Sequence, residues 1–357
     1  MVDTKRFVLI KRFVLIDGHA LIHRAYHAYP KTLTTRKGEL VNAVYGFTSI
    51  LFSIFKELHP EYVAVAFDLK GPTFRHKEFT DYKITRPKVD EELINQIDRV
   101  KQVVKALNIP IFEVAGFEAD DVIGTLTRRI RNQDLLHENI SSSNRARKRT
   151  KTKIGANRRD ALKIIIASGD RDILQLLDKN VTAYFPAKGK MPARIIEEQT
   201  FRKEYGFQPL QLIDYKALAG DASDNIPGVA GIGPKKASLL VQKFDSVEKL
   251  YQHLNGDKDI AAVVEETGLS KLDVEKLKNS QSQAELSKRL ATIVIDVPIK
   301  LKLQACKLSD YDVDKVIQLF QELEFRTLIN RLPGHEKIKE KKKEKPKKKG
   351  DKQMELF

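Results

Sequence analysis

Short apolar runs alternate with amphipathic stretches through the first half of the chain. Five runs have the length and composition of buried strands, and they cover residues 12–16, 62–67, 109–114, 162–168 and 181–185. Between them, helix-like apolar periodicity covers residues 40–58, 90–108 and 118–133. Strands that alternate with helices pair in parallel, and nearly continuous apolar strands indicate a sheet covered on both faces. The pattern therefore predicts an α/β domain, followed by a mostly helical region up to about residue 331.

Acidic residues follow these strands or open the next helix. In an open parallel sheet, the carboxyl ends of the strands share one edge, and ligands bind beyond it. Two further acids, three residues apart, lie in the later segment GDASDNIPG. The nine acids that we expect at one crevice are Asp17, Asp68, Glu118, Asp120, Asp121, Asp170, Asp172, Asp221 and Asp224.

Each acid alone has a simpler interpretation, because an Asp after a strand often forms a turn or caps a helix. Several carboxylates that converge without matched cations repel one another, however, and divalent cations relieve that repulsion. Mg²⁺ suits such a site because it takes oxygen ligands, whereas no His and Cys cluster has zinc spacing. Two metals can bind a phosphodiester, activate a water and stabilise the leaving oxygen. The sequence offers no convincing Ser–His or Cys–His pair, so it favours metal-dependent hydrolysis.

The positive charge is concentrated in two short segments. The 357 residues carry a formal net charge of +16, and 41% of them are hydrophobic, which is enough for a sizeable core. Residues 145–160 hold eight Lys and Arg against one Asp, and residues 336–352 hold ten Lys against four acids. Both segments are low in complexity and read as disordered. Such segments attract polyanions, above all nucleic acid, although a solubilising role is the alternative.

The single cysteine, Cys306, excludes an internal disulfide and fits a reducing cytoplasm. No apolar run is long enough to cross a bilayer. Lys11 and Arg12 interrupt the apolar core that a signal peptide would need. We therefore expect a cytoplasmic, nucleoid-associated protein with no membrane partner.

Five motifs in order carry a resemblance to a known family. They read LIDGHALIHRAYHA, VAFDLKGPTFRHKEFTDYKITRP, GFEADDVIGTL, IASGDRDILQLL and GDASDNIPGVAGIGPKKA. Together they resemble the 5′-nuclease domain of bacterial DNA polymerase I, in the flap endonuclease superfamily, over roughly residues 12–332. The resemblance implies a PIN-like, mostly parallel sheet, a helical arch over the active site and a helix–three-turn–helix element that grips duplex DNA.

The activity that the resemblance implies is 5′-3′ exonuclease and 5′-flap endonuclease cleavage of DNA and RNA primers in replication and repair. It implies two or more Mg²⁺ ions, with Mn²⁺ able to substitute, and a monomeric enzyme. All nine acids match the family's metal-site positions. Arg75, Lys83 and Arg86 match the family's basic residues near the arch, where cations can neutralise the scissile phosphate. Arg75 could instead pair with an acid of the site.

The segment GVAGIGPKKA lies next to the last pair of acids. Its glycines allow a backbone to pass close to a phosphate, and its lysines add charge. After GDASDNIP it indicates non-specific binding of a duplex backbone. The residues are Gly228, Gly231, Gly233, Lys235 and Lys236. The resemblance also implies a monovalent cation, K⁺, bound by carbonyl oxygens of this element.

Four features depart from the family. No polymerase follows, so the chain is either a stand-alone nuclease or a fragment. A basic insertion covers about 134–160, within a catalytic domain expected over residues 12–196. The third departure is a disordered lysine-rich tail, 333–357, which follows the expected helical DNA-binding domain over 197–332. Finally, KRFVLI occurs twice, and only the second copy precedes Asp17, so we expect residues 1–11 to be a dispensable extension.

The tail ends in QMELF, which resembles the pentapeptide that binds the bacterial sliding clamp. Gln353 would bind through its amide, and an apolar groove would hold Met354, Leu356 and Phe357. Two other functions stay open beside the 5′ nuclease. A PIN-type ribonuclease would share the acidic sheet but lack GVAGIGPKKA, and a non-catalytic adaptor for DNA and clamp would have lost its acids.

Overall fold

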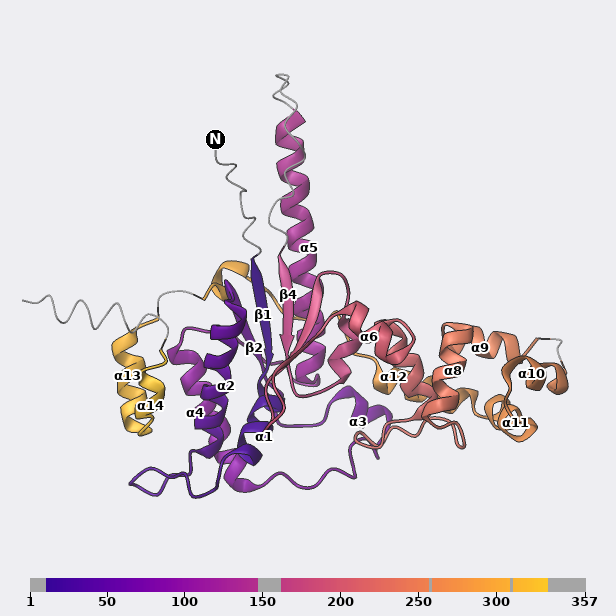
Figure 1. The fold of residues 1–357 in the computed structure, drawn as a ribbon, viewed down its shortest axis with the longest axis horizontal. Coiled ribbons are helices and arrows are strands. Elements are labelled where there is room, and N and C mark those ends of the chain that lie inside the picture. Colours follow the sequence, from indigo (N-terminus) through magenta and orange to yellow (C-terminus); the bar gives the residue numbers. More distant parts are fainter. Residues whose placement is uncertain (1–10, 147–161, 257–258, 309–310, 333–357) are drawn as a thin grey trace, which may run out of the picture.

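A six-stranded sheet forms the centre of the computed structural model, which describes residues 11–146, 162–256, 259–308 and 311–332, with side chains outside 133–146 (Figure 1). The strand order is β3-β2-β1-β4-β5-β6. The central strand β1 (Arg12–Asp17) is the second copy of the repeated segment. It pairs in parallel with β2 (Tyr62–Ala66) and β4 (Lys163–Ala167), and Leu15 lies opposite Ala64 and Ile166.

Five of the six strands were expected. β3 (Ile111–Phe112) and β5 (Val181–Phe185) extend the parallel sheet on its two sides. The sequence did not predict β6 (Arg194–Ile196), which pairs antiparallel with β5. This strand has three residues with two of them exposed, so it lacks the apolar run that marked the buried strands.

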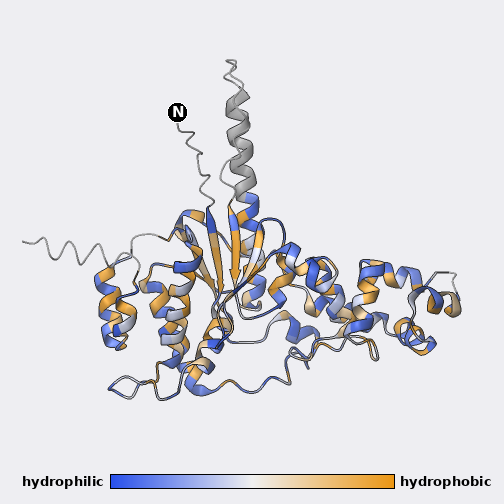
Figure 2. Ribbon diagram, in the orientation of Figure 1, coloured by the Kyte–Doolittle hydropathy of each residue, from blue (hydrophilic) through white to orange (hydrophobic). Residues whose placement is uncertain are grey.

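Helices cover both faces of the sheet (Figure 1). One face packs against α1 (Gly18–Ala28), α2 (Asn42–Leu58) and α4 (Glu91–Ala106) in a single apolar cluster. The other packs against α5 (Ala119–Ala146) and the short helix η1 (Asp172–Leu176). Figure 2 shows the strands as mostly hydrophobic, as expected for a sheet buried on both sides.

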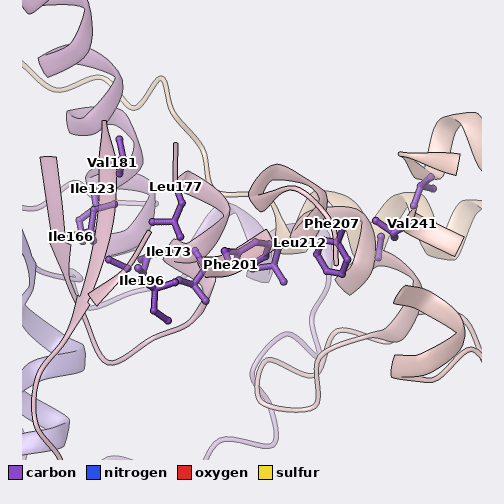
Figure 3. Close-up of a cluster of buried hydrophobic side chains, with 14 of the residues drawn as sticks. Ile123, Ile166, Ile173, Leu177, Val181, Ile196, Phe201, Phe207, Leu212 and Val241 are labelled. Atoms are coloured by element: carbon purple, nitrogen blue, oxygen red, sulfur yellow. The ribbon is translucent and has the colours of Figure 1, made fainter. Parts of the chain in front are cut away.

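The second half of the chain is helical, as predicted. Its elements before the final turn are α6 (Glu198–Tyr205), η2 (Pro209–Gln211), α7 (Leu212–Ala219), α8 (Pro234–Phe244), α9 (Val247–Leu254), α10 (Ile260–Thr267), α11 (Lys271–Asn279) and α12 (Gln281–Ala291). One apolar cluster runs from the sheet into this region without a break. Figure 3 follows it from Ile166 on β4 through Phe201 and Leu212 to Val241 on α8. This shared core fixes α7 and α8 relative to the strand ends.

The end of the described chain returns to the first half. The turn η3 (Leu303–Cys306) runs beside β2, where Leu308 N donates to Glu61 O at 2.8 Å. The helices α13 (Val313–Glu322) and α14 (Arg326–Ile329) then join the core of α2 and α4. The expected DNA-binding domain, 197–332, therefore includes a last part that packs with the N-terminal helices.

The segment between β2 and α4 is where the resemblance implied a helical arch. Its helical part is limited to α3 (Phe74–Glu78), and turns follow from Thr80 to Arg86. Pro87 lacks a backbone N–H and disfavours helix at the residue before it, which explains why no helix forms there. Lys83 has a φ of 58°, and its N–H donates to Asp224 O at 2.9 Å.

Several predictions fall on residues that the structure does not describe. The repeated copy within 1–10, the basic residues 147–161 and the tail 333–357 with QMELF all lie outside the described ranges. The expected insertion at 134–160 begins inside α5, which runs on to Ala146 rather than ending near 133. Among the described residues, no helix is long and apolar enough to span a membrane.

Candidate metal and nucleic-acid site

The carboxyl end of β1 delivers the first acid. Asp17 is buried and caps α1, since its Oδ1 accepts from Ala20 N at 3.0 Å. Its Oδ2 accepts from the Ser168 hydroxyl at 2.7 Å. Burial raises the pKa of Asp17 to about 7, and the negative charges of Asp68 and Asp170 act in the same direction. The carboxylate is thus held in place by neutral donors while its charge is left uncompensated.

Asp68 brings the end of β2 to the start of α5. Its Oδ1 accepts from Ala119 N at 2.7 Å, and its own N–H donates to His19 Nδ1 at 2.9 Å. Asp120, the next residue of α5, has a pKa well above its ordinary value. Burial is the main cause, and the charges of neighbouring acids add to it. Strands β1 and β2 and helix α5 therefore bring acids to one edge of the sheet.

Ser168 connects this group to the end of β4. Its Oγ accepts from Asp170 N at 2.9 Å while the same hydroxyl donates to Asp17. Asp170 in turn accepts from Asp172 N at 2.9 Å. Ser168 is fully buried, and sequence reasoning missed it. The one feature of the sequence that could have indicated Ser168 is its position directly before the glycine and aspartate of IASGD.

Four of the acids share one property. In the described part of the chain, none of them forms an ion pair with a Lys or Arg side chain, and they are Asp17, Asp68, Asp120 and Asp170. Within that same part, no group of three or more His, Cys, Asp and Glu side chains is arranged to hold a metal ion as it stands. The oxygen-only donors and the uncompensated charge nevertheless fit a hard divalent cation.

The other acids are held by cations, two of which come from the turns after α3. Lys83 Nζ lies 2.8 Å from Glu118 Oε1 and 3.6 Å from Asp224 Oδ2. Arg86 Nη2 lies 2.5 Å from Asp224 Oδ1. Burial lowers the pKa of Lys83, but the charges of Glu118 and Asp224 outweigh it and leave the pKa raised. The structure thus places both of these cations against the acids.

A third cation was not foreseen. Lys216 of α7 is buried and contacts both Asp172 and Asp221, the latter at 2.5 Å. Burial raises the pKa of Asp172 to about 6, and the charge of Asp170 acts in the same direction. The sequence signal for Lys216 was a lone basic residue in the otherwise apolar helix LIDYKALA, just before GDASD.

Arg75 and Asp121 form an ion pair, which is the alternative that the sequence left open for Arg75. Arg75 is buried, and its Nη1 and Nη2 each lie 2.8 Å from an oxygen of Asp121. The same guanidinium donates to the backbone oxygens of Leu290 and Thr292 at 2.9 and 2.7 Å. Asp121 also accepts from Val294 N at 2.8 Å. The pair therefore joins α3 to α5 and to the end of α12.

Tyr82 is a further group that sequence reasoning missed. It is buried, and its hydroxyl lies 3.1 Å from Glu118 Oε2 and 3.0 Å from Asp224 Oδ2. A single hydroxyl proton serves one of these acceptors at a time, so Tyr82 bridges α5 and the GDASDN segment. The motif DYKITRP contained it, but nothing in the sequence indicated where it points.

The helix–turn–helix element is formed by α7 and α8 and the loop between them, which we call the hairpin. Gly231 and Gly233 are exposed, as a close approach of a phosphate requires. Gly228 is buried instead, and a Cβ added there would lie 2.3 Å from Gly220 N. Gly228 thus closes the hairpin against its own backbone and is not part of the exposed surface, contrary to the expectation.

The two hairpin lysines also differ. Lys235 is exposed at the start of α8. Lys236 Nζ lies 2.8 Å from Asp273 Oδ1 and 3.1 Å from Gly231 O. The sequence had treated the two lysines as equivalent, but only Lys235 presents its charge without an ion pair in the described chain.

Comparison with known proteins follows the same division of the chain. Residues 12–146 match the family model of the 5′-3′ exonuclease N-terminal resolvase-like domain, and residues 207–314 match that of the 5′-3′ exonuclease C-terminal SAM fold. The chain belongs to the 5′-3′ exonuclease family. The family's helical SAM-type region contains the hairpin, and its resolvase-like region contains β1, β2 and the start of α5.

The chain is similar in sequence to DNA polymerase I of several bacteria. It is 36% identical over 323 residues to DNA polymerase I of Caldicellulosiruptor bescii, covering 90% of this chain and 33% of that protein. It is 40% identical over 328 residues to DNA polymerase I of Chloroflexus aurantiacus, covering 90% and 31%. The chain thus spans about a third of the length of the curated relatives it matches.

Solved structures share the fold of this exonuclease-family chain. The 5′-exonuclease of phage T5, with divalent metal ions (zinc) bound, matches with a TM-score of 0.58 at 18% identity, covering 88% of this chain and 98% of that one. Human GEN1 in complex with Holliday junction DNA matches with a TM-score of 0.54 at 14% identity, covering 95% and 76%. At these identities the likeness concerns the fold.

Proposed function

We propose that this chain is a divalent-metal-dependent nuclease that hydrolyses phosphodiesters at the 5′ ends and 5′ flaps of DNA, RNA primers included, in replication and repair. The observation that carries the proposal is the set of four acids without cation partners, Asp17, Asp68, Asp120 and Asp170, beside Lys83 and Arg86. A phosphate entering such a site meets both the metal ligands and the cations that stabilise its charge.

The four unpaired acids are the first ligands in this proposal. Glu118, Asp172, Asp221 and Asp224 complete the set, and each already holds its carboxylate near the others through Lys83, Arg86 or Lys216. Mg²⁺ fits these oxygen donors, and Mn²⁺ would substitute. Bound metal supplies Lewis acidity, which polarises the phosphate and makes a water nucleophilic at neutral pH. The binding of zinc by the T5 5′-exonuclease supports a divalent-metal site in this fold.

Lys83 and Arg86 bind the reacting phosphate in this proposal. Each now lies against a carboxylate, Glu118 or Asp224. A phosphate at the site offers a stronger charge partner, and both side chains reach it from the same turn. They then stabilise the charge that develops on the phosphate oxygens as the bond to the leaving oxygen breaks. No nucleophilic side chain is needed.

The hairpin holds the duplex beside the reacting strand. Its exposed glycines and Lys235 suit contacts with phosphates and carry no information about base sequence. We extend the proposal to K⁺ at the hairpin, where loop carbonyl oxygens would be its ligands. The complexes of GEN1 and of the T5 flap endonuclease with DNA support nucleic-acid binding by this fold.

The test is cleavage of a labelled 5′-flap DNA by the full chain, with Mg²⁺ and with EDTA. We expect cleavage only with Mg²⁺, and complete loss of cleavage in Asp17→Asn while flap binding measured by anisotropy persists. Cleavage that is undiminished in EDTA would refute the proposal. Cleavage of single-stranded RNA but not of flap DNA would favour a PIN-type ribonuclease, and DNA binding without cleavage would favour an adaptor.

Three further parts of the proposal concern residues outside the described ranges or the cellular context. We propose that Gln353, Met354, Leu356 and Phe357 bind a bacterial sliding clamp, with 333–352 as a tether. We propose that the basic segment 145–160 adds non-specific DNA affinity. We also propose that the chain acts as a monomer on nucleoid DNA in the cytoplasm. Equal clamp binding by peptide 346–357 and by its variant with Leu356→Ala and Phe357→Ala would refute the clamp contact.

A further inference from the structure

The second hairpin lysine is committed to the protein itself. Lys236 Nζ donates to Asp273 Oδ1 at 2.8 Å and to Gly231 O at 3.1 Å. Asp273 is buried, and it also accepts from the Ser270 hydroxyl at 2.7 Å through its other oxygen, within the capping box of α11. Lys236 therefore ties α11 to the hairpin loop, and its charge is compensated.

A different lysine occupies the place beside the exposed loop glycine. Lys276 lies one turn further along α11 than Asp273, so the two side chains share a face of the helix. A Cβ added at Gly231 would lie 3.1 Å from Lys276 Nζ and 3.4 Å from its Cδ. Gly231 itself is exposed, has a φ of 86°, which favours glycine, and has no Cβ to cover its backbone.

Lys276 keeps its charge uncompensated. In the described part of the chain it forms no ion pair, in contrast with Lys236, which contacts Asp273, and with Lys243, which contacts Glu266. Its side chain is half-buried, so the ammonium is held beside the loop and does not sweep freely through solvent. A held and unpaired ammonium beside an exposed glycine backbone is the arrangement that a phosphate contact requires.

We propose that Lys276 of α11 contacts a DNA backbone phosphate at Gly231, and that Lys236 is a positioning residue that holds α11 there. This inference rests on the proposed function, because it supposes that duplex DNA lies on the hairpin. It adds α11 to the DNA-binding surface formed by α7 and α8. It also assigns to Lys276 a phosphate contact that the sequence had assigned to Lys236, 40 residues earlier in the chain. The ligand is the phosphate backbone of duplex DNA, without regard to base sequence.

The test measures the salt dependence of duplex binding in EDTA, where no cleavage occurs. Each lost phosphate contact lowers the slope of log K against log salt by about 0.9. We expect Lys276→Ala and Lys276→Gln to lose about that much slope and to bind several-fold more weakly at ~0.15 M salt. Lys278→Ala is the matched control, because it removes the same charge from the same helix about 200° around its axis.

Lys236→Ala separates positioning from contact. We expect it to lower the melting temperature as well as the affinity, whereas Lys276→Ala should leave the melting temperature within about 2 °C. Equal slopes for wild type, Lys276→Ala and Lys278→Ala would overturn the inference. The proposed function would stand in that case if the wild type still cleaves flap DNA with Mg²⁺, and it would fall only if that cleavage is absent too.

Discussion

Two buried aspartates illustrate how the partner of a residue decides its role. Asp121 has Arg75 against both of its oxygens, whereas Asp17 receives only neutral donors. We predict that Asp121→Asn lowers the free energy of unfolding by about 3–5 kcal/mol, because the buried Arg75 then keeps only Glu118, 3.3 Å from its Nη1, as a carboxylate partner. The same change at Asp17 should not destabilise in EDTA, and should stabilise by on the order of 1 kcal/mol, because it removes a charge that burial penalises and that Asp68 and Asp170 repel.

Urea unfolding of the two variants in EDTA measures this contrast, since the chemical change is identical. Asp17→Asn in the presence of Mg²⁺ serves as the control, because the wild type should then gain stability that the variant lacks. A loss of more than about 2 kcal/mol for Asp17→Asn in EDTA would show that its carboxylate is structural.

A second residue-scale prediction separates transition-state stabilisation from DNA affinity. Lys83→Ala should lower single-turnover flap cleavage by at least about 100-fold while changing the flap Kd by less than about threefold, since Lys83 acts on the reacting phosphate. Lys235→Ala should do the reverse and flatten the salt dependence of binding. Quench-flow cleavage and anisotropy titrations give both quantities, and a shared profile for the two variants would contradict the division.

The sequence predicted the residues of the site better than their pairing. Strand ends placed Asp17, Asp68 and Asp170 at one edge, because that follows from local pattern and the geometry of parallel sheets. The contacts of Lys216 with Asp172 and of Tyr82 with Asp224 join segments far apart in the chain, and no local periodicity encodes them. The same limit left Arg75 open between two roles until its contacts were known.

At the scale of elements, the hairpin depends on one close crossing of its own backbone. Gly228 has a φ of 63°, and a Cβ there would lie 2.3 Å from Gly220 N. We predict that Gly228→Ala destabilises the protein by more than about 2 kcal/mol, because it combines left-handed strain with a clash against backbone. Gly233→Ala should change stability by less than about 1 kcal/mol, since its φ is −79° and nothing lies within 4 Å of the added atom.

Thermal unfolding and duplex binding of the two glycine variants check this prediction. Gly228→Ala should weaken binding of DNA because the hairpin distorts. Gly233→Ala leaves the hairpin intact and serves as the control for adding a methyl group to an exposed glycine. Similar stability losses for both would mean that the crossing of Gly228 and Gly220 does not limit the fold. The sequence predicted three permissive glycines but could not distinguish a glycine exposed to a ligand from one pressed against its own chain.

Two elements differ from what hydrophobic periodicity and the resemblance led us to expect. β6 is too short for a pattern, and its strand character comes from pairing with β5. The expected arch contains turns and only a five-residue helix, because Pro87 and polar residues from Thr80 onward favour turns. In both cases tertiary contacts or turn chemistry, rather than hydrophobic periodicity, set the outcome.

At the scale of the molecule, the last described helices stabilise the first part of the fold. Phe320 of α13 is fully buried, with ring centroids 6.0 Å from Phe52 on α2 and 5.9 Å from Phe325. We predict that Phe320→Ala lowers the free energy of unfolding by about 3–5 kcal/mol. Gln318→Ala, an exposed change on the same helix, is the control and should stay within about 0.5 kcal/mol.

The packing between α13 and the rest of the fold determines how Phe320→Ala should change the calorimetric unfolding curve. α2 packs against α1, and Asp17 caps the start of α1, so α13 supports the helices that carry this acid. A single core also joins the sheet to α7 and α8. Phe320→Ala should therefore shift one cooperative unfolding transition to lower temperature. At 20 °C or below, where the variant is still folded, its affinity for flap DNA and its requirement for Mg²⁺ should equal those of the wild type. Two separate transitions, with only one of them shifted, would show instead that α13 and α14 unfold independently of the sheet.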